Sequence, residues 1–181
     1  MQRLSLGSVR VISYCAFRGC VALKELLIPS SVERLERLAF SQCTSLQSVR
    51  VESEIVEIED GTFSACSALR DITLPSSLRV IGYAAFSHCS SLQELVPPEV
   101  KEIRPCAFTK CHSLRRLSIP TVEHIHPEAF KDCRALRELT LGEARVDHGA
   151  FRGCAMVLTI PSNMLAEDAF EPEVWRTRIV Y

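Results

Sequence analysis

Short segments that alternate between apolar and polar residues recur along this chain. The segments 26–29, 49–51, 72–75, 117–120 and 139–141 have a period of two, which is typical of half-buried strands. Proline ends several of them, because it has no N–H to offer a strand ladder. A second short segment follows, as at 32–35, 55–58 and 122–125. The pattern therefore predicts pairs of short strands in a repeating unit.

One phenylalanine marks each unit. The eight phenylalanines stand at 17, 40, 63, 86, 108, 130, 151 and 170, with spacings of 23, 23, 23, 22, 22, 21 and 19. Alanine precedes each of them except Phe63, which follows Thr62, and seven are followed three residues later by cysteine. One such unit cannot bury its own apolar edge, whereas stacked units share a continuous core. We therefore expect a solenoid in which the phenylalanine rings form one stacked column.

The units resemble a known family. Residues 69–89, LRDITLPSSLRVIGYAAFSHC, are similar to BspA-type leucine-rich repeats, and the resemblance covers roughly residues 4–170. It implies an α/β or mainly β solenoid, a right-handed coil of short parallel strands with about seven to eight repeats and no large helices. It also implies an adhesion or protein-interaction module, as in bacterial surface proteins and protist families, although a shared fold does not fix a role.

The two ends of the chain are expected to differ in how they close the solenoid. We expect residues 1–170 to form the solenoid and residues 171–181 to form a capping segment. Ile179 and Tyr181 follow Phe170 at the distances at which strand residues follow Phe17; a flexible tail is the alternative. The chain begins inside a repeat without a polar cap, so we expect either a fragment or an N-terminal edge that a partner or another copy covers.

Composition narrows the class of protein. The 181 residues are 47% hydrophobic with a net charge of −1, which suits one domain with a sizeable core. A charge so close to zero indicates no general affinity for nucleic acid or for an anionic membrane. No apolar run approaches the ~20 residues of a membrane span, and the first residues lack the long apolar stretch of a signal peptide.

The nine cysteines favour packing over covalent chemistry. Seven occupy the same repeat position, whereas Cys15 and Cys106 fall outside this column, and no C-x-x-C motif occurs. Neighbours stacked ~5 Å apart would be within reach of a disulfide. We favour instead free, buried thiols that act as small apolar side chains. This favours a reducing, intracellular compartment, with the cell surface as the alternative.

Candidate chemistry is sparse. His124 and His126 share one face of a strand, and Asp147 and His148 in the next repeat are possible further ligands, but the spacing matches no metal motif and Pro127 follows directly. We therefore expect two solvated histidines, no metal site and no cofactor. The sequence also contains no phosphate loop, no G-x-S-x-G motif and no paired acid–base carboxylates, so we expect no catalytic residue and no enzyme.

Outward strand positions are free to bind a partner, because inward positions are fixed by packing. The residues predicted to bind are Lys24, Glu25, Arg50, Arg70, Asp71, Glu94, Arg115, Arg116, Arg137 and Glu138. Their mixed charge favours a protein of complementary charge, and the alternative is a merely solvated face. Aromatic side chains are absent from these positions, which makes nucleic acid an unlikely partner. The sequence thus predicts a protein-interaction scaffold, free or as a structural subunit of an assembly; the alternative is a surface adhesin ectodomain.

Overall fold

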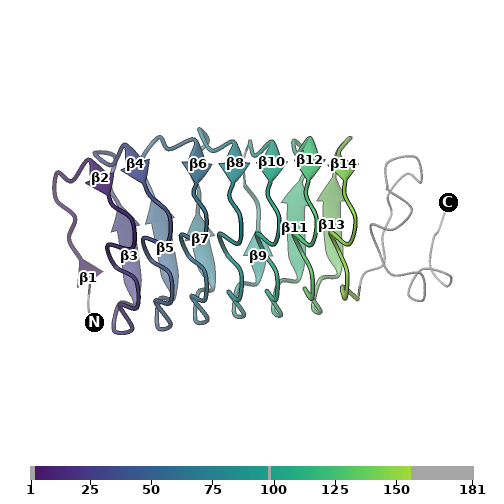
Figure 1. The fold of residues 1–181 in the computed structure, drawn as a ribbon, viewed down its shortest axis with the longest axis horizontal. Coiled ribbons are helices and arrows are strands. Elements are labelled where there is room, and N and C mark those ends of the chain that lie inside the picture. The colour runs from purple at the N-terminus through teal and green to yellow at the C-terminus, as the bar shows by residue number, and fades with distance from the viewer. Residues whose placement is uncertain (1–2, 98, 156–181) are drawn as a thin grey trace, which may run out of the picture.

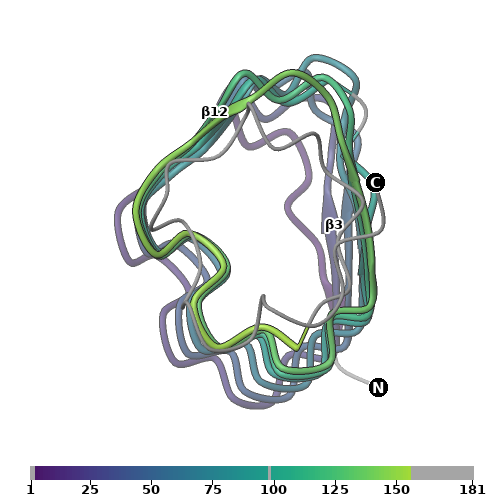
Figure 2. The same cartoon turned by 90° about the vertical axis from the view of Figure 1, so that its right-hand side faces the viewer.

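The chain coils into a solenoid whose turns stack along one axis (Figure 1). The computed structural model describes residues 3–97 and 99–155, which contain fourteen short strands and no helix, and therefore no helix that could cross a membrane. Viewed along the axis, successive turns follow nearly the same closed outline (Figure 2). The predicted mainly β solenoid is confirmed. Phe170 and the predicted cap at 171–181 lie outside the described residues.

Seven strands form the wall that we call the long-strand column. They are β1 (Arg3–Leu4), β3 (Glu25–Ile28), β5 (Ser48–Val51), β7 (Asp71–Thr73), β9 (Glu94–Leu95), β11 (Arg116–Ile119) and β13 (Glu138–Leu141). All pairs are parallel, in the orders β1-β3-β5-β7 and β9-β11-β13. β9 is shorter than its neighbour β11 because Pro97 stands where β11 has Ile119, and proline offers no N–H.

Seven strands of two residues form the short-strand column. They are β2 (Val11–Ile12), β4 (Arg34–Leu35), β6 (Glu57–Ile58), β8 (Val80–Ile81), β10 (Glu102–Ile103), β12 (His124–Ile125) and β14 (Arg145–Val146). They pair in parallel as β2-β4 and as β6-β8-β10-β12-β14. This column lies across the core from the long-strand column, as the positions of β12 and β3 show (Figure 2).

The phenylalanine rings form one stack between the walls. From Phe17 to Phe151, neighbouring ring centroids are 5.1–5.8 Å apart and the ring planes differ by only 1–13°. The separation is close to the spacing of paired strands, so each ring follows the pitch of the backbone. The predicted column is confirmed for the seven described phenylalanines, and every ring except that of Phe17 is buried.

The cysteine column lies directly beside this stack and has a second role. Six of its seven thiols are buried: Cys43, Cys66, Cys89, Cys111, Cys133 and Cys154. Each of the six Sγ atoms lies 3.1–3.2 Å from the carbonyl oxygen of the phenylalanine one repeat earlier. That carbonyl also accepts the N–H of the cysteine in its own turn, as Phe63 does from Cys66. Cysteine therefore fills a small apolar space and also donates a hydrogen bond across repeats.

Burial should make these thiols slow to react. It raises the pKa of Cys89 to about 12 and also raises the pKa of Cys111 and Cys133. Because the thiolate is the nucleophile, these groups react slowly at mildly alkaline pH. We expect iodoacetamide to label the half-buried Cys15 and Cys106 in the folded protein, and Cys89, Cys111 and Cys133 only after unfolding. Mass spectrometry of labelled peptides measures this, and equal labelling rates for Cys89 and Cys15 would contradict it.

Candidate binding surface and histidine cluster

The ten residues predicted to bind a partner line the outward side of the long-strand column. Glu25 of β3 and Asp71 of β7 occupy the same register position, with Ser48 of β5 between them. Glu94, Arg116 and Glu138 share the equivalent position on neighbouring strands of the second sheet. The remaining residues lie at the next outward position or just before the strands: Lys24, Arg50, Arg70, Arg115 and Arg137. Glu25 is half-buried and the other nine are exposed. The structure thus brings all ten onto one wall, divided where β7 and β9 do not pair.

A groove hollows the first half of this surface. It has a volume of about 640 Å³ and is lined by outward residues of β3, β5 and β7, among them Leu27, Arg50 and Thr73, together with the segment 4–7. Leu27 is 45% exposed and gives the groove an apolar floor. Sequence reasoning identified the outward positions but missed the groove, because the path of segment 4–7 is not encoded in the repeat pattern.

The charged side chains of this surface differ in what they already contact. Arg116 lies between two carboxylates, 2.7 Å from Glu138 and 3.5 Å from Glu94. Its hydrogen bond and charge lower the pKa of Glu138. Arg137 donates to the backbone carbonyls of Arg134, Leu136 and Ala155 at 3.0–3.2 Å. The side chains of Arg116 and Arg137 are therefore already engaged in contacts within the chain.

Three other cations on this surface are uncommitted, which means that their side chains have no such contact in the described part of the chain. Within residues 3–97 and 99–155, the side chains of Lys24, Arg70 and Arg115 make no hydrogen bond or ion pair. They occupy equivalent positions of their repeats, one residue before β3, β7 and β11 respectively. An exposed guanidinium without a partner can pair with a carboxylate of another molecule without first breaking a contact within its own chain. These are the residues of the predicted set best placed to meet a partner.

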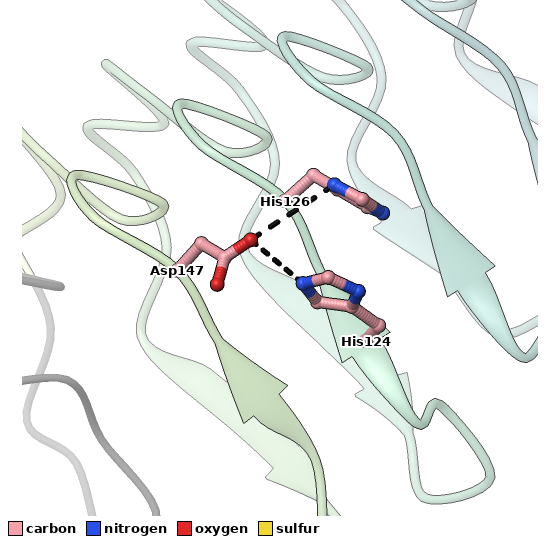
Figure 3. A group of neighbouring side chains, drawn as sticks. All are labelled: His124, His126 and Asp147. Atoms are coloured by element: carbon pink, nitrogen blue, oxygen red, sulfur yellow. Dashed lines mark hydrogen bonds and ion pairs between the residues drawn. The ribbon is translucent and has the colours of Figure 1, made fainter.

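A cluster of two histidines and a carboxylate lies on the short-strand column (Figure 3). His124 belongs to β12 and His126 follows it, while Asp147 follows the neighbouring strand β14. His124 Nε2 is 2.7 Å and His126 Nδ1 is 3.9 Å from Asp147 Oδ2. The two imidazole centroids are 3.8 Å apart. The side chains are 19–28% exposed, so the three groups are half-buried.

Charged neighbours surround the cluster. His126 Nε2 lies 2.9 Å from Glu102 Oε1, and Arg145 Nε donates to Asp147 Oδ1 at 3.0 Å. Burial opposes ionisation of Asp147, but the hydrogen bond and charge of His124, together with Arg145, hold the pKa of this carboxyl below its ordinary value. Asp147 is therefore anionic at neutral pH. Sequence reasoning named Asp147 but missed Glu102, which the parallel register of β10 and β12 places beside the histidines.

Comparison with known proteins settles the family. The model of the BspA type leucine rich repeat region matches residues 3–115 and 69–171, in six copies. The chain belongs to the BspA-type leucine-rich repeat family. The resemblance seen in residues 69–89 is thereby confirmed. No curated protein matches the chain.

Solved structures of bacterial leucine-rich repeat proteins share this BspA-type fold. The T. pallidum leucine-rich repeat protein is 34% identical, with a TM-score of 0.73 over 86% of this chain and 73% of that protein. A Bacteroides ovatus protein is 28% identical, with a TM-score of 0.70 over 87% of this chain, which spans about half (49%) of its length. A leucine rich cell surface protein of Faecalibacterium prausnitzii is 32% identical, with a TM-score of 0.58 over 67% of this chain and 32% of that protein. None of these matches indicates an enzymatic family.

Proposed function

We propose that this BspA-type solenoid is a protein–protein interaction scaffold, free or as a subunit of a larger assembly, that binds through the outward side of its long-strand column. The observation that carries the proposal is the set of exposed, uncommitted cations Lys24, Arg70 and Arg115 on the same wall as the groove. Parallel repeats hold these charges on a rigid frame, which lowers the entropic cost of binding.

The chemistry of this wall indicates the kind of partner. Lys24 and Arg70 suit acidic side chains, and Leu27 in the groove suits an apolar side chain. The partner is therefore a protein that presents carboxylates beside an apolar residue. Complementary charge of this kind speeds association and selects the partner. Nucleic acid remains a less favoured partner, because the wall carries acidic as well as basic residues and no aromatic side chain.

Charge reversal tests the proposal. The double substitution Arg70→Glu and Arg115→Glu should reduce capture of the native partner by at least about tenfold, the equivalent of ~1.4 kcal/mol, without lowering stability. Arg137 is left intact because its guanidinium holds three backbone carbonyls. The measurement is affinity capture with quantitative mass spectrometry, at low and at high salt, since screening weakens contacts between exposed charges.

The matched control reverses two exposed cations outside the strand columns. Arg18→Glu and Lys110→Glu, both on the phenylalanine turns, change the net charge equally and should leave capture unchanged. Equal loss in both double variants would show a non-specific charge effect. Full capture by the Arg70/Arg115 variant would refute binding through this wall.

A surface adhesin ectodomain is the second candidate. Its support is the similarity to a leucine rich cell surface protein, which extends over 67% of this chain. Protease treatment of intact cells of the source organism distinguishes the two: an adhesin is cleaved while a cytosolic marker survives, whereas an internal scaffold is protected together with the marker.

A further inference from the structure

We propose that His124, His126 and Asp147 form a binding site for a divalent transition metal of the Zn²⁺ class, which clips two neighbouring repeats together. One potential ligand atom of each residue lies within 4.8 Å of the other two. The site lies on the short-strand column, across the core from the proposed binding wall, so it stands or falls independently of the proposed function (Figure 2).

The distances are close to those of a metal site. Zn²⁺ binds imidazole nitrogen at about 2.0–2.1 Å, so tetrahedral ligand atoms lie roughly 3.4 Å apart. The pair His124 Nε2 and Asp147 Oδ2 at 2.7 Å has to open slightly, and the pair His126 Nδ1 and Asp147 Oδ2 at 3.9 Å has to close slightly. Both changes are smaller than about 1 Å. The ligand atoms of the two histidines also lie within 4.8 Å of each other. An ion between these atoms replaces the proton that His124 shares with Asp147.

Neighbouring groups orient two of the three ligands. His126 Nε2 is within hydrogen-bond distance of Glu102 Oε1, which favours the tautomer with its proton on Nε2 and its lone pair on Nδ1, directed toward Asp147 (Figure 3). A carboxylate behind a ligating histidine is a recurrent arrangement in zinc sites, where it fixes the ring and increases ligand basicity. Arg145 holds Asp147 Oδ1 and leaves Oδ2 facing the imidazoles.

The cluster is open to dissolved ions, and its ligand types favour particular metals. The three side chains are 19–28% exposed, so a dissolved ion can reach them and water can fill a fourth position. Arg104 lies 3.8 Å from Glu102 and Arg145 lies beside Asp147, so the carboxylates are already partly neutralised and general attraction to any cation is weak. Two imidazoles then select Zn²⁺, Ni²⁺ or Cu²⁺ over Mg²⁺, which prefers oxygen ligands.

The test is calorimetric titration of the full chain with ZnCl₂ and, as the oxygen-preferring control, with MgCl₂. We expect one equivalent of Zn²⁺ to bind and to raise Tm, with no binding of Mg²⁺. His126→Gln and Asp147→Asn should each weaken Zn²⁺ binding at least about tenfold, because each removes one of three ligands. His112→Gln, at an exposed histidine away from the cluster, should not weaken it.

A second measurement on the unaltered protein guards against variants that fail to fold and against binding by cysteine. Co²⁺ bound by imidazole and carboxylate shows d–d bands without the near-ultraviolet thiolate charge-transfer band. That spectrum supports the site. A thiolate band, an absence of Zn²⁺ binding, or unchanged Zn²⁺ affinity in folded His126→Gln and Asp147→Asn variants would each overturn the proposal.

Discussion

Replacing Phe108 by alanine is expected to lower the free energy of unfolding by about 3–5 kcal/mol, the usual range for removing a buried aromatic ring. Phe108 is fully buried, and its ring is stacked 5.2 Å from Phe86 and 5.1 Å from Phe130. Its removal leaves a cavity between two rings that the backbone pitch holds apart, so the gap cannot close by collapse. Contacts with both neighbouring repeats are lost at once.

Equilibrium unfolding in urea, followed by circular dichroism, measures this loss. Phe17→Ala is the control, because Phe17 is only half-buried and has one described ring neighbour, Phe40 at 5.1 Å. Its effect should be smaller, since part of its surface already meets water. Equal losses at the two positions would contradict a stack in which each interior ring is supported from both sides.

The sequence predicted the walls and the core of this solenoid because each depends on a strictly repeated position. Phenylalanine, cysteine and the aliphatic residue of the short strand recur with nearly constant spacing, and parallel stacking needs only that recurrence. The strand limits were less predictable. The segment 72–75 was expected to be a strand, whereas β7 covers Asp71–Thr73, because Pro75 and the residue before it leave the ladder.

Local hydrogen bonding between repeats was not predictable from the pattern. After the short strand, the N–H of Tyr14 donates to Glu36 Oε2 of the next repeat, whereas that of Tyr83 donates to Asp60 Oδ1 of the preceding one. Pro105 occupies the same position and has no N–H at all. The backbone N–H at this position is thus satisfied in two different ways and is absent in a third repeat, and the repeat pattern alone does not distinguish the first two.

The histidine cluster was also predictable only in part, because the repeat pattern gives three of its residues and the strand register is needed for the fourth. Alternation along one strand places His124 and His126 on one face, and the neighbouring repeat adds Asp147. The carboxylate of Glu102 becomes relevant only through the pairing of Glu102 with His124 across β10 and β12. Because the repeats differ in length, a fixed offset along the sequence does not find such partners, whereas aligning each short strand by its aliphatic residue does.

The buried alanine before an interior phenylalanine is expected to tolerate threonine but not leucine. Ala107 is fully buried, as are Ala39, Ala85, Ala129 and Ala150 at the same repeat position. Leucine at 107 adds three carbon atoms to a space that the neighbouring repeats close, and such overpacking costs typically about 1–3 kcal/mol. Urea unfolding of Ala107→Leu should therefore show a loss of that size.

Threonine is the informative control because the chain already carries it once. Thr62 takes the place of alanine before Phe63, is fully buried, and donates its hydroxyl to the carbonyl of Glu59 at 2.7 Å. Position 107 offers the equivalent acceptor, since the Ala107 N–H already points at the carbonyl of Arg104. Ala107→Thr should therefore fold with a loss under about 1 kcal/mol, because its buried hydroxyl finds a partner. If Ala107→Leu and Ala107→Thr lower the free energy of unfolding equally, this position does not select for small size. The alanines must then be explained by the turn conformation alone.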